Sequence, residues 1–156
     1  MPANSGLDMD FETILKISDH ENIIGLKDSG GNLSKMGYVK KMAKPDFQIL
    51  AGSAGFLLPA FTVGAVGGIL ALANIAPQKC ISIYEDYHSG NIEKAQKTQL
   101  DIIPINAAVT SNWGVPALKA AMDYVGLFGG IARKPLLPLK EETKRKVIDL
   151  IEKHIG

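Results

Sequence analysis

Three short apolar runs in the first half of the chain predict three buried β-strands. Each run is too short for a helix, carries apolar residues on both faces, and ends in turn-forming residues. The runs start near residues 23, 47 and 69, a spacing typical of βα units rather than of an antiparallel sandwich. The strands are expected at 22–27, 47–51 and 69–73.

Amphipathic segments lie between and after these strands and predict helices. The expected helices that accompany the strands are 10–20, 32–43 and 54–65. From Pro77 onward only helices are expected, at 78–88, 91–111 with a kink at Pro104, 116–124 and 141–154. The first six residues are expected to be loop. The pattern predicts an α/β fold, either an open doubly wound sheet or part of a (β/α)₈ barrel.

One uncharged stretch allows a second interpretation. Between Phe47 and Gln78 there is no acidic, basic or histidine residue, and 56–76 is long enough for a membrane span. Pro59, the Gly67-Gly68 pair and Asn74 interrupt it where a helix and a strand would need breaks. We therefore favour a buried α/β core and expect no membrane partner.

Composition and the lack of certain motifs exclude several classes of function. The 17 Lys and Arg residues balance 16 Asp and Glu residues, so no nucleic-acid partner is expected. The single cysteine, Cys80, excludes an internal disulfide and a cysteine-based zinc site. His20, His88 and His154 lack metal-ligand spacing, and neither a Gly-x-Gly-x-x-Gly nor a Walker motif occurs. Neither a metal nor a nucleotide cofactor is therefore expected.

Lys27 is the main candidate for chemistry. It ends an apolar strand, at the edge where both predicted architectures bind ligands. Alternation places it on one face with Gly25, which would leave room beside its stem. In apolar surroundings the neutral amine is favoured, and this amine can attack a carbonyl carbon. The alternative is a lysine that reaches water or pairs with Asp28.

Several polar residues near the strand ends leave two interpretations open. Ser29, Ser53 and Asn74 follow the three strands and can either bind a small polar substrate or cap the next helices. The Gly30-Gly31 pair can either bind an anion through its backbone N–H groups or form only a turn. Asn32 is expected to cap the helix that follows.

Several motifs, in order along the chain, resemble the dihydrodipicolinate synthase/N-acetylneuraminate lyase family. They are Pro2-Ala3-Asn4-Ser5-Gly6, Ile24-Gly25-Leu26-Lys27-Asp28-Ser29-Gly30-Gly31, Leu50-Ala51-Gly52-Ser53-Ala54-Gly55, Gly68-Ile69-Leu70-Ala71-Leu72-Ala73-Asn74, Asn106-Ala107-Ala108-Val109-Thr110, Gly114-Val115-Pro116-Ala117-Leu118-Lys119 and Arg133-Lys134-Pro135-Leu136. This resemblance covers essentially the whole chain and implies class I aldolase chemistry, in which pyruvate is bound as a Schiff base. Within the family it is closest to the mitochondrial 4-hydroxy-2-oxoglutarate aldolase branch.

The resemblance implies roles for six residues. Lys27 would be the Schiff-base lysine, with Ser29 beside it in the pocket. Gly52 and Ser53 would line the site, and the backbone carbonyl of Ile69 would face the lysine. Asn4 stands where the synthase branch usually carries an arginine for the second substrate's carboxylate. The implied reaction is cleavage of 4-hydroxy-2-oxoglutarate to pyruvate and glyoxylate, without a cofactor.

The chain also departs from the family pattern. A (β/α)₈ domain needs about 250 residues, whereas this sequence supplies the last three βα units in 1–76 and a C-terminal helical region, expected to be a bundle, in 77–156. The family's tyrosine would fall before Met1, and the loop for the pyruvate carboxylate is missing. A truncated product with impaired activity is therefore expected.

The truncation leaves alternatives for function and location. The chain could act as the lyase, catalyse a synthase-like pyruvate condensation, or be inert and associate with full-length subunits. Full-length relatives imply a homo-oligomer, a homotetramer, in the mitochondrion. The first residues carry no transit peptide, so a cytoplasmic location is expected for the chain as it stands.

Overall fold

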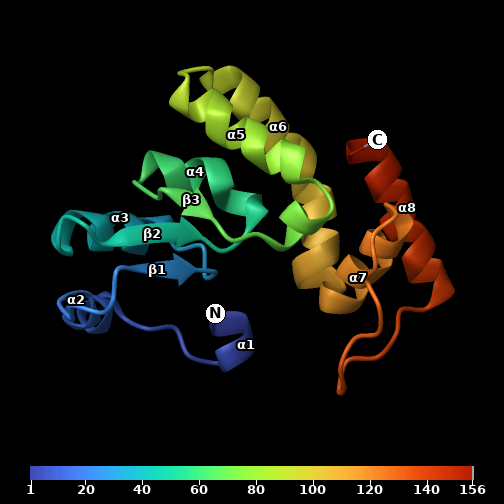
Figure 1. Ribbon diagram of the computed structural model, residues 1–156, viewed down its shortest axis with the longest axis horizontal. Coiled ribbons are helices and arrows are strands. Elements are labelled where there is room, and N and C mark those ends of the chain that lie inside the picture. The colour runs from blue at the N-terminus through green and yellow to red at the C-terminus, as the bar shows by residue number, and fades with distance from the viewer. Residues whose placement is uncertain (156) are drawn as a thin grey trace. The chain divides into compact units, whose positions relative to one another are not determined.

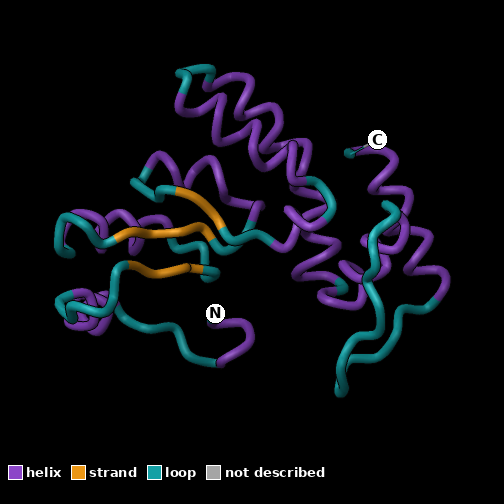
Figure 2. Tube along the Cα trace, viewed as in Figure 1, coloured by secondary structure: helices purple, strands orange, loops and turns teal. Residues whose placement is uncertain are grey.

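The computed structural model describes residues 1–155, which form two units, Met1–Ile69 and the segment from Leu70 onward. The first unit contains a three-stranded parallel sheet in the order β1-β2-β3 (Figure 2). Its strands are β1 (Gly25–Asp28), β2 (Gln48–Ala51) and β3 (Gly67–Gly68). The parallel βα arrangement predicted from the sequence is confirmed.

The third strand differs from its prediction. The sequence pattern placed it at 69–73, but β3 is Gly67–Gly68, and Ala71–Asn74 forms the 3₁₀ helix η2. Ile69 still donates its N–H to the carbonyl of Ala51 at 2.9 Å, after which the chain leaves the sheet. A short alanine- and leucine-rich run suits a helical turn as well as a strand, so its hydrophobicity alone was not decisive.

Short helices precede, separate and follow the strands of this sheet along the chain (Figure 1). The helices of the first unit are α1 (Pro2–Ser5), α2 (Phe11–Ser18), α3 (Leu33–Met42), the 3₁₀ helix η1 (Ala54–Phe56) and α4 (Leu57–Thr62). The expected helix 54–65 is therefore split into η1 and α4. Pro59 lies in the first turn of α4, where the N–H that proline lacks has no partner in the helix.

Helix α1 was not predicted, because its residues were interpreted as loop. Pro2 is its first residue, and Gly6 ends it with a φ of 69°. Proline at a helix start and glycine just after its end is a known pairing. Pro2 and Gly6 together could therefore have indicated this helix from the sequence.

The core of the first unit lies between the sheet and the helices that follow its strands. Helix α3 contacts β2, and α4 contacts α3 and β3. The buried apolar residues include Ile14, Met36, Val39, Phe47, Ile49, Ala51, Leu57, Ala60 and Phe61. They come from α2, α3, α4 and from β2 with the residue before it, so the central strand and the helices supply this core.

The regular structure of the second unit is helical in its described residues, and a long loop joins its last two helices over 125–140. After η2 come α5 (Pro77–His88), α6 (Ile92–Ala107), a π-helical segment (Ala108–Asn112), α7 (Gly114–Tyr124) and α8 (Glu141–His154). Helix α8 has the predicted bounds, and it contacts α6 and α7. The π-helical segment follows Pro104, which has no N–H for the regular ladder. No helix within 1–155 is both long and apolar enough to cross a membrane.

Candidate active site

Lys27 lies on the open face of the sheet. It is the third residue of β1 and pairs with Leu50 of β2. Residues paired in parallel strands share a face, so Lys27 and Leu50 lie opposite to Asp28 and Ala51. Ala51 is fully buried and Asp28 is 8% exposed, whereas Lys27 and Leu50 are only half-buried. The predicted position of Lys27, at the carboxyl end of its strand, is confirmed.

The ammonium group of Lys27 does not pair with Asp28. Its Nζ atom lies 3.8 Å from the Sδ atom of Met1, a weak acceptor. Within the described residues, the lysines that form ion pairs are Lys35, Lys94 and Lys146. The pairing with Asp28 considered from the sequence is therefore wrong, and no carboxylate of residues 1–155 holds the amine.

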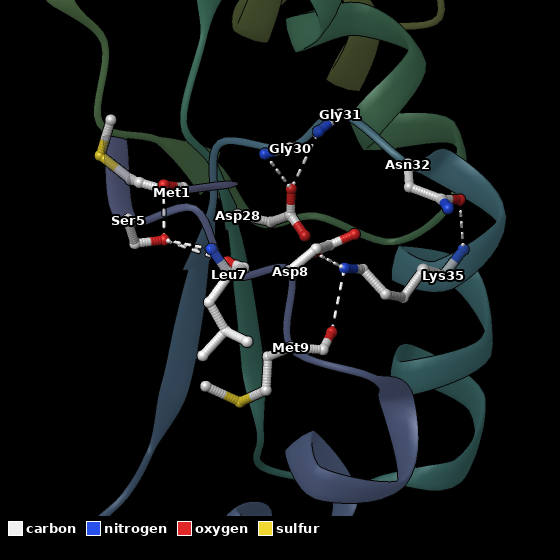
Figure 3. Close-up of polar contacts among 10 residues, drawn as sticks. All are labelled: Met1, Ser5, Leu7, Asp8, Met9, Asp28, Gly30, Gly31, Asn32 and Lys35. Carbon is white, nitrogen blue, oxygen red and sulfur yellow. Dashed lines mark hydrogen bonds and ion pairs between the residues drawn. The ribbon is translucent and has the colours of Figure 1, made fainter. Parts of the chain in front are cut away.

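Asp28 instead stabilises the turn after β1. Its Oδ1 atom accepts hydrogen bonds from the N–H groups of Gly30 at 2.8 Å and Gly31 at 3.0 Å (Figure 3). Gly31 has a φ of 76° and faces the ring of Phe56. These two N–H groups already have an acceptor, so the hypothesis that they bind an anion is wrong. The turn serves to fix the end of β1.

Asn32 completes this turn by capping α3. Its side-chain oxygen accepts from the N–H of Lys35 at 3.0 Å, as predicted for an N-cap (Figure 3). The end of β1 and the start of α3 are thus joined by side-chain hydrogen bonds on both sides of Gly31. This arrangement places Lys27 and Ser29 on a fixed segment.

The three polar residues after the strands have different surroundings. Ser53 caps η1, because its Oγ atom accepts from the N–H of Gly55 at 3.2 Å. Asn74 belongs to η2 and donates its side-chain amide to the carbonyl of Ala71 at 2.9 Å. Both side chains thus make local hydrogen bonds, and a role of either in binding a substrate stays a prediction. The Oγ atom of Ser29, by contrast, is buried without a hydrogen-bond partner among residues 1–155.

Two glycines allow close approach of the backbone. The N–H of Gly52 donates to the carbonyl of Asp28 at 2.6 Å, and a Cβ at Gly52 would lie 2.1 Å from the Ser29 Oγ atom. A Cβ at Gly25 would lie 2.5 Å from the carbonyl oxygen of Gln48. The lack of a side chain at Gly25 therefore allows the neighbouring strand to approach closely. That Gly25 also leaves room for the Lys27 stem stays a prediction.

The remaining predicted residues lie at the two ends of the first unit. Asn4 is exposed on α1, one helical turn from Met1, and its N–H donates to the Met1 carbonyl at 3.0 Å. Ile69 follows β3 directly, and its side chain is 56% exposed. Their roles in binding stay predictions.

Sequence reasoning placed Asn4 of α1 in this region but missed the contacts that Met1 and Pro2 make there. Besides the contact of Met1 with Lys27, the ring of Pro2 lies 3.4 Å from where a Cβ at Gly30 would be. Helix α1 therefore lies beside the carboxyl end of β1 (Figure 1). No group of three potential metal ligands from His, Cys, Asp and Glu exists in the part of the chain that the structure describes.

Comparison with known proteins gives the family. The family model described as "Dihydrodipicolinate synthetase family" matches residues 1–154. The chain belongs to the dihydrodipicolinate synthetase family. This agrees with the resemblance seen in the sequence motifs, although the closeness to one branch of the family is not shown.

Individual relatives support the assignment. The chain is 33% identical over 155 residues to the 4-hydroxy-tetrahydrodipicolinate synthase of Methanosarcina acetivorans, covering 98% of this chain and 53% of the relative. It is 32% identical to the enzyme of the same name from Methanosarcina barkeri, with the same coverage of both chains. The chain thus spans about half the length of the curated relatives it matches.

Solved structures of the family share the fold. The dihydrodipicolinate synthase of Bacillus anthracis superposes with a TM-score of 0.92 at 28% identity, covering 97% of this chain and 52% of that structure. The enzyme of Thermotoga maritima has a TM-score of 0.91 at 23% identity, covering 99% of this chain and 54% of that structure, a likeness of fold alone. The three parallel βα units of this chain are consistent with the predicted part of a (β/α)₈ barrel.

Proposed function

We propose that Lys27 forms a Schiff base with a 2-oxo acid of the pyruvate type and that the chain carries this part of a class I lyase site. The observation that carries the proposal is the environment of the Lys27 amine. It lies at the carboxyl end of a parallel strand, on the open face, and contacts a thioether instead of a carboxylate. A lysine amine can act as the nucleophile that forms an imine with a carbonyl compound, and no ion pair within the described residues holds this one.

The chemistry follows from the amine. The Nζ atom attacks the C2 carbonyl of the 2-oxo acid, and loss of water from the carbinolamine gives a protonated imine. For a 4-hydroxy-2-oxo acid, the C3–C4 bond then breaks, and its electron pair enters the imine system as an enamine. The C4 hydroxyl loses its proton and becomes an aldehyde. Protonation of the enamine at C3 and hydrolysis of the imine release pyruvate.

The proposed substrate is 4-hydroxy-2-oxoglutarate, which would give pyruvate and glyoxylate. Asn4 supports this choice, because the synthase branch usually has an arginine at the matching position. The names of the curated relatives support an alternative, since they are 4-hydroxy-tetrahydrodipicolinate synthases. In that alternative the Lys27 enamine of pyruvate attacks an aldehyde in a condensation. A further alternative is an inert chain that associates with full-length subunits.

Borohydride trapping tests the proposal directly. The chain is incubated with pyruvate, reduced, and analysed by intact mass and peptide mapping. A pyruvate adduct on Lys27 that is lost in Lys27→Arg is the expected result. Lys44→Arg is the matched control, because Lys44 is also half-buried and its Nζ atom donates a hydrogen bond to the carbonyl of His20 at 3.1 Å. The Methanosarcina acetivorans synthase, treated in parallel, verifies the trapping conditions.

Two results would overturn the proposal. The first is the absence of an adduct on Lys27 in a chain that is folded by circular dichroism, while the synthase is trapped. The second is equal labelling of Lys27 and the exposed lysines, which would indicate non-specific reductive alkylation. Either result would favour the inert alternative.

A further inference from the structure

Lys35 connects α3 to the segment between α1 and α2. Its Nζ atom forms an ion pair with the Oδ1 atom of Asp8 and donates a hydrogen bond to the carbonyl of Met9 at 3.2 Å (Figure 3). Both acceptors lie more than twenty residues away in the sequence, so this contact holds two distant parts of the first unit together.

The lysine of this ion pair is more buried than the lysines of the other two ion pairs in the described chain. The side chain of Lys35 is 11% exposed, whereas those of Lys94 and Lys146 are 71% and 57% exposed. The carboxylate partner Asp8 is 55% exposed, and Asp86, the partner of Lys94, is 7% exposed. A lysine withdrawn from water is costly unless its charge is paired and its N–H groups have acceptors. Asp8 and Met9 supply both to Lys35, so this mostly buried side chain holds the segment against α3.

Helix α1 precedes the segment that Lys35 holds, and most of its polar contacts are within the helix or with the residues just after it. The hydroxyl of Ser5 donates to the carbonyl of Met1 at 2.9 Å, and it accepts from the N–H of Leu7 at 3.3 Å (Figure 3). These bonds shape the short helix but do not hold it against the sheet. Its contacts there are those of Met1 and Pro2 described above. The polar contact nearest to α1 along the chain is that of Lys35 with Asp8 and Met9.

We infer that Lys35 is a positioning residue: through Asp8 and Met9 it holds α1 beside the carboxyl end of β1, and so places Met1 and Asn4 relative to Lys27. The inference rests on the proposed function, in which Lys27 is the nucleophile and Asn4 favours a 4-hydroxy-2-oxo acid with a distal carboxylate. Lys35 itself does not touch the substrate. Its loss should therefore alter the selectivity of the site more than its capacity to form an imine.

The position of α1 is measured first, without substrate. In the full chain with ¹³C-methyl methionine, the methyl group of Met1 should show a nuclear Overhauser contact with the Lys27 side chain, and Met1→Leu assigns the signal. We expect Lys35→Met to lose this contact and Lys35→Arg to retain it. Lys146→Met, which removes the Lys146–Glu142 ion pair on α8, is the control and should leave it unchanged.

The consequence for the site is measured as a ratio of two trapping rates on Lys27, with 4-hydroxy-2-oxoglutarate and with pyruvate. Both substrates use the same amine, so a general loss of structure would lower both rates and leave the ratio unchanged. We expect Lys35→Met and Asp8→Asn each to lower the ratio about 2- to 10-fold, the effect of about one net hydrogen bond. The double variant should add little, because the two side chains form one contact.

The outcomes separate this inference from the proposed function. Retention of the Met1–Lys27 contact in Lys35→Met would show that Lys35 does not hold α1 beside β1, whether or not Lys27 forms an imine. Loss of the contact with an unchanged ratio would overturn the positioning role. A chain that shows the Met1–Lys27 contact but forms no adduct on Lys27 with either substrate would contradict the proposed function. The contact of Lys35 with Asp8 and Met9 would then be a structural feature only.

Discussion

The hydroxyl of Ser29 occupies the space that a side chain at Gly52 would need. A Cβ at Gly52 would lie 2.1 Å from the Ser29 Oγ atom and 2.6 Å from the carbonyl oxygen of Asp28. We expect Gly52→Ala to destabilise the chain by about 1–3 kcal/mol, the usual cost of overpacking. Urea unfolding monitored by circular dichroism measures this cost.

A second glycine provides the control for this measurement. Gly37 lies inside α3, and a Cβ there would meet Val63 at an ordinary 3.6 Å. Gly37→Ala should stabilise the chain by about 0.5–1 kcal/mol, because alanine loses less backbone freedom in a helix. Equal effects of the two substitutions would show that the contact between Ser29 and Gly52 is not tight in solution.

Ser29→Ala should separate stability from function. The Oγ atom of Ser29 is buried and has no hydrogen-bond partner among the described residues. A buried unpaired polar atom costs about 1–3 kcal/mol, so its removal should leave stability unchanged or raise it. If Ser29 serves the imine, pyruvate trapping on Lys27 should fall in the same variant. Lower stability together with unchanged trapping would assign Ser29 a structural role.

The cap of α2 predicts a dependence on pH. The N–H of Thr13 donates to the Oδ1 atom of Asp10 at 2.7 Å, and this bond lowers the pKa of Asp10 below its ordinary value of 3.8. A lowered folded-state pKa means that the contribution to stability is present above about pH 4 and is lost as the pH falls through the folded-state pKa. Asp10→Asn keeps a cap without a titrating charge.

The thermal unfolding midpoint, measured between pH 6 and pH 2, tests this effect. The decrease on acidification should be smaller in Asp10→Asn than in the wild-type chain. Glu12→Gln is a suitable control, since Glu12 is also in the first turn of α2 but does not cap it. Identical profiles for the wild-type chain and Asp10→Asn would contradict the prediction.

The single cysteine should react slowly while the chain is folded. Burial raises the pKa of the Cys80 thiol from 9.0 to about 11. Only about one thiol in a thousand is then ionised at pH 8, and the thiolate is the reactive form. Iodoacetamide labelling followed by mass spectrometry should be slow in buffer and fast in urea. The raised pKa also means that this group stabilises the fold below pH 9 and loses that contribution between pH 9 and 11.

Much of the fold followed from periodicity and turn chemistry. Strands β1 and β2, the cap at Asn32 and the bounds of α8 were all predicted, because each depends on residues close in the sequence. Strand β3 was misplaced because its pairing partner is Ala51, seventeen residues earlier, and the local run also suits a helical turn. Edge strands of two residues carry little pattern of their own.

The site was predictable in its position but not in its contacts. Lys27 stands out as a charged residue that ends an apolar strand, and the structure places it on the open face. The contact with Met1 and the tether from Lys35 to Asp8 join residues that no periodicity relates. Such contacts depend on how α1 and α3 pack, which a single sequence does not encode locally.

The free edge of β1 gives the last prediction. Strand β1 ends the described sheet, so its outer backbone groups have no strand partner, and Ile24 just before it is 70% exposed. Unpaired edges next to apolar side chains favour pairing between chains. The chain should therefore self-associate at micromolar concentration, as light scattering after size exclusion would show. Ile24→Lys should reduce association without unfolding, because the Ile24 carbonyl would still accept from the N–H of Gln48 at 2.9 Å. A monomeric wild-type chain would contradict the prediction.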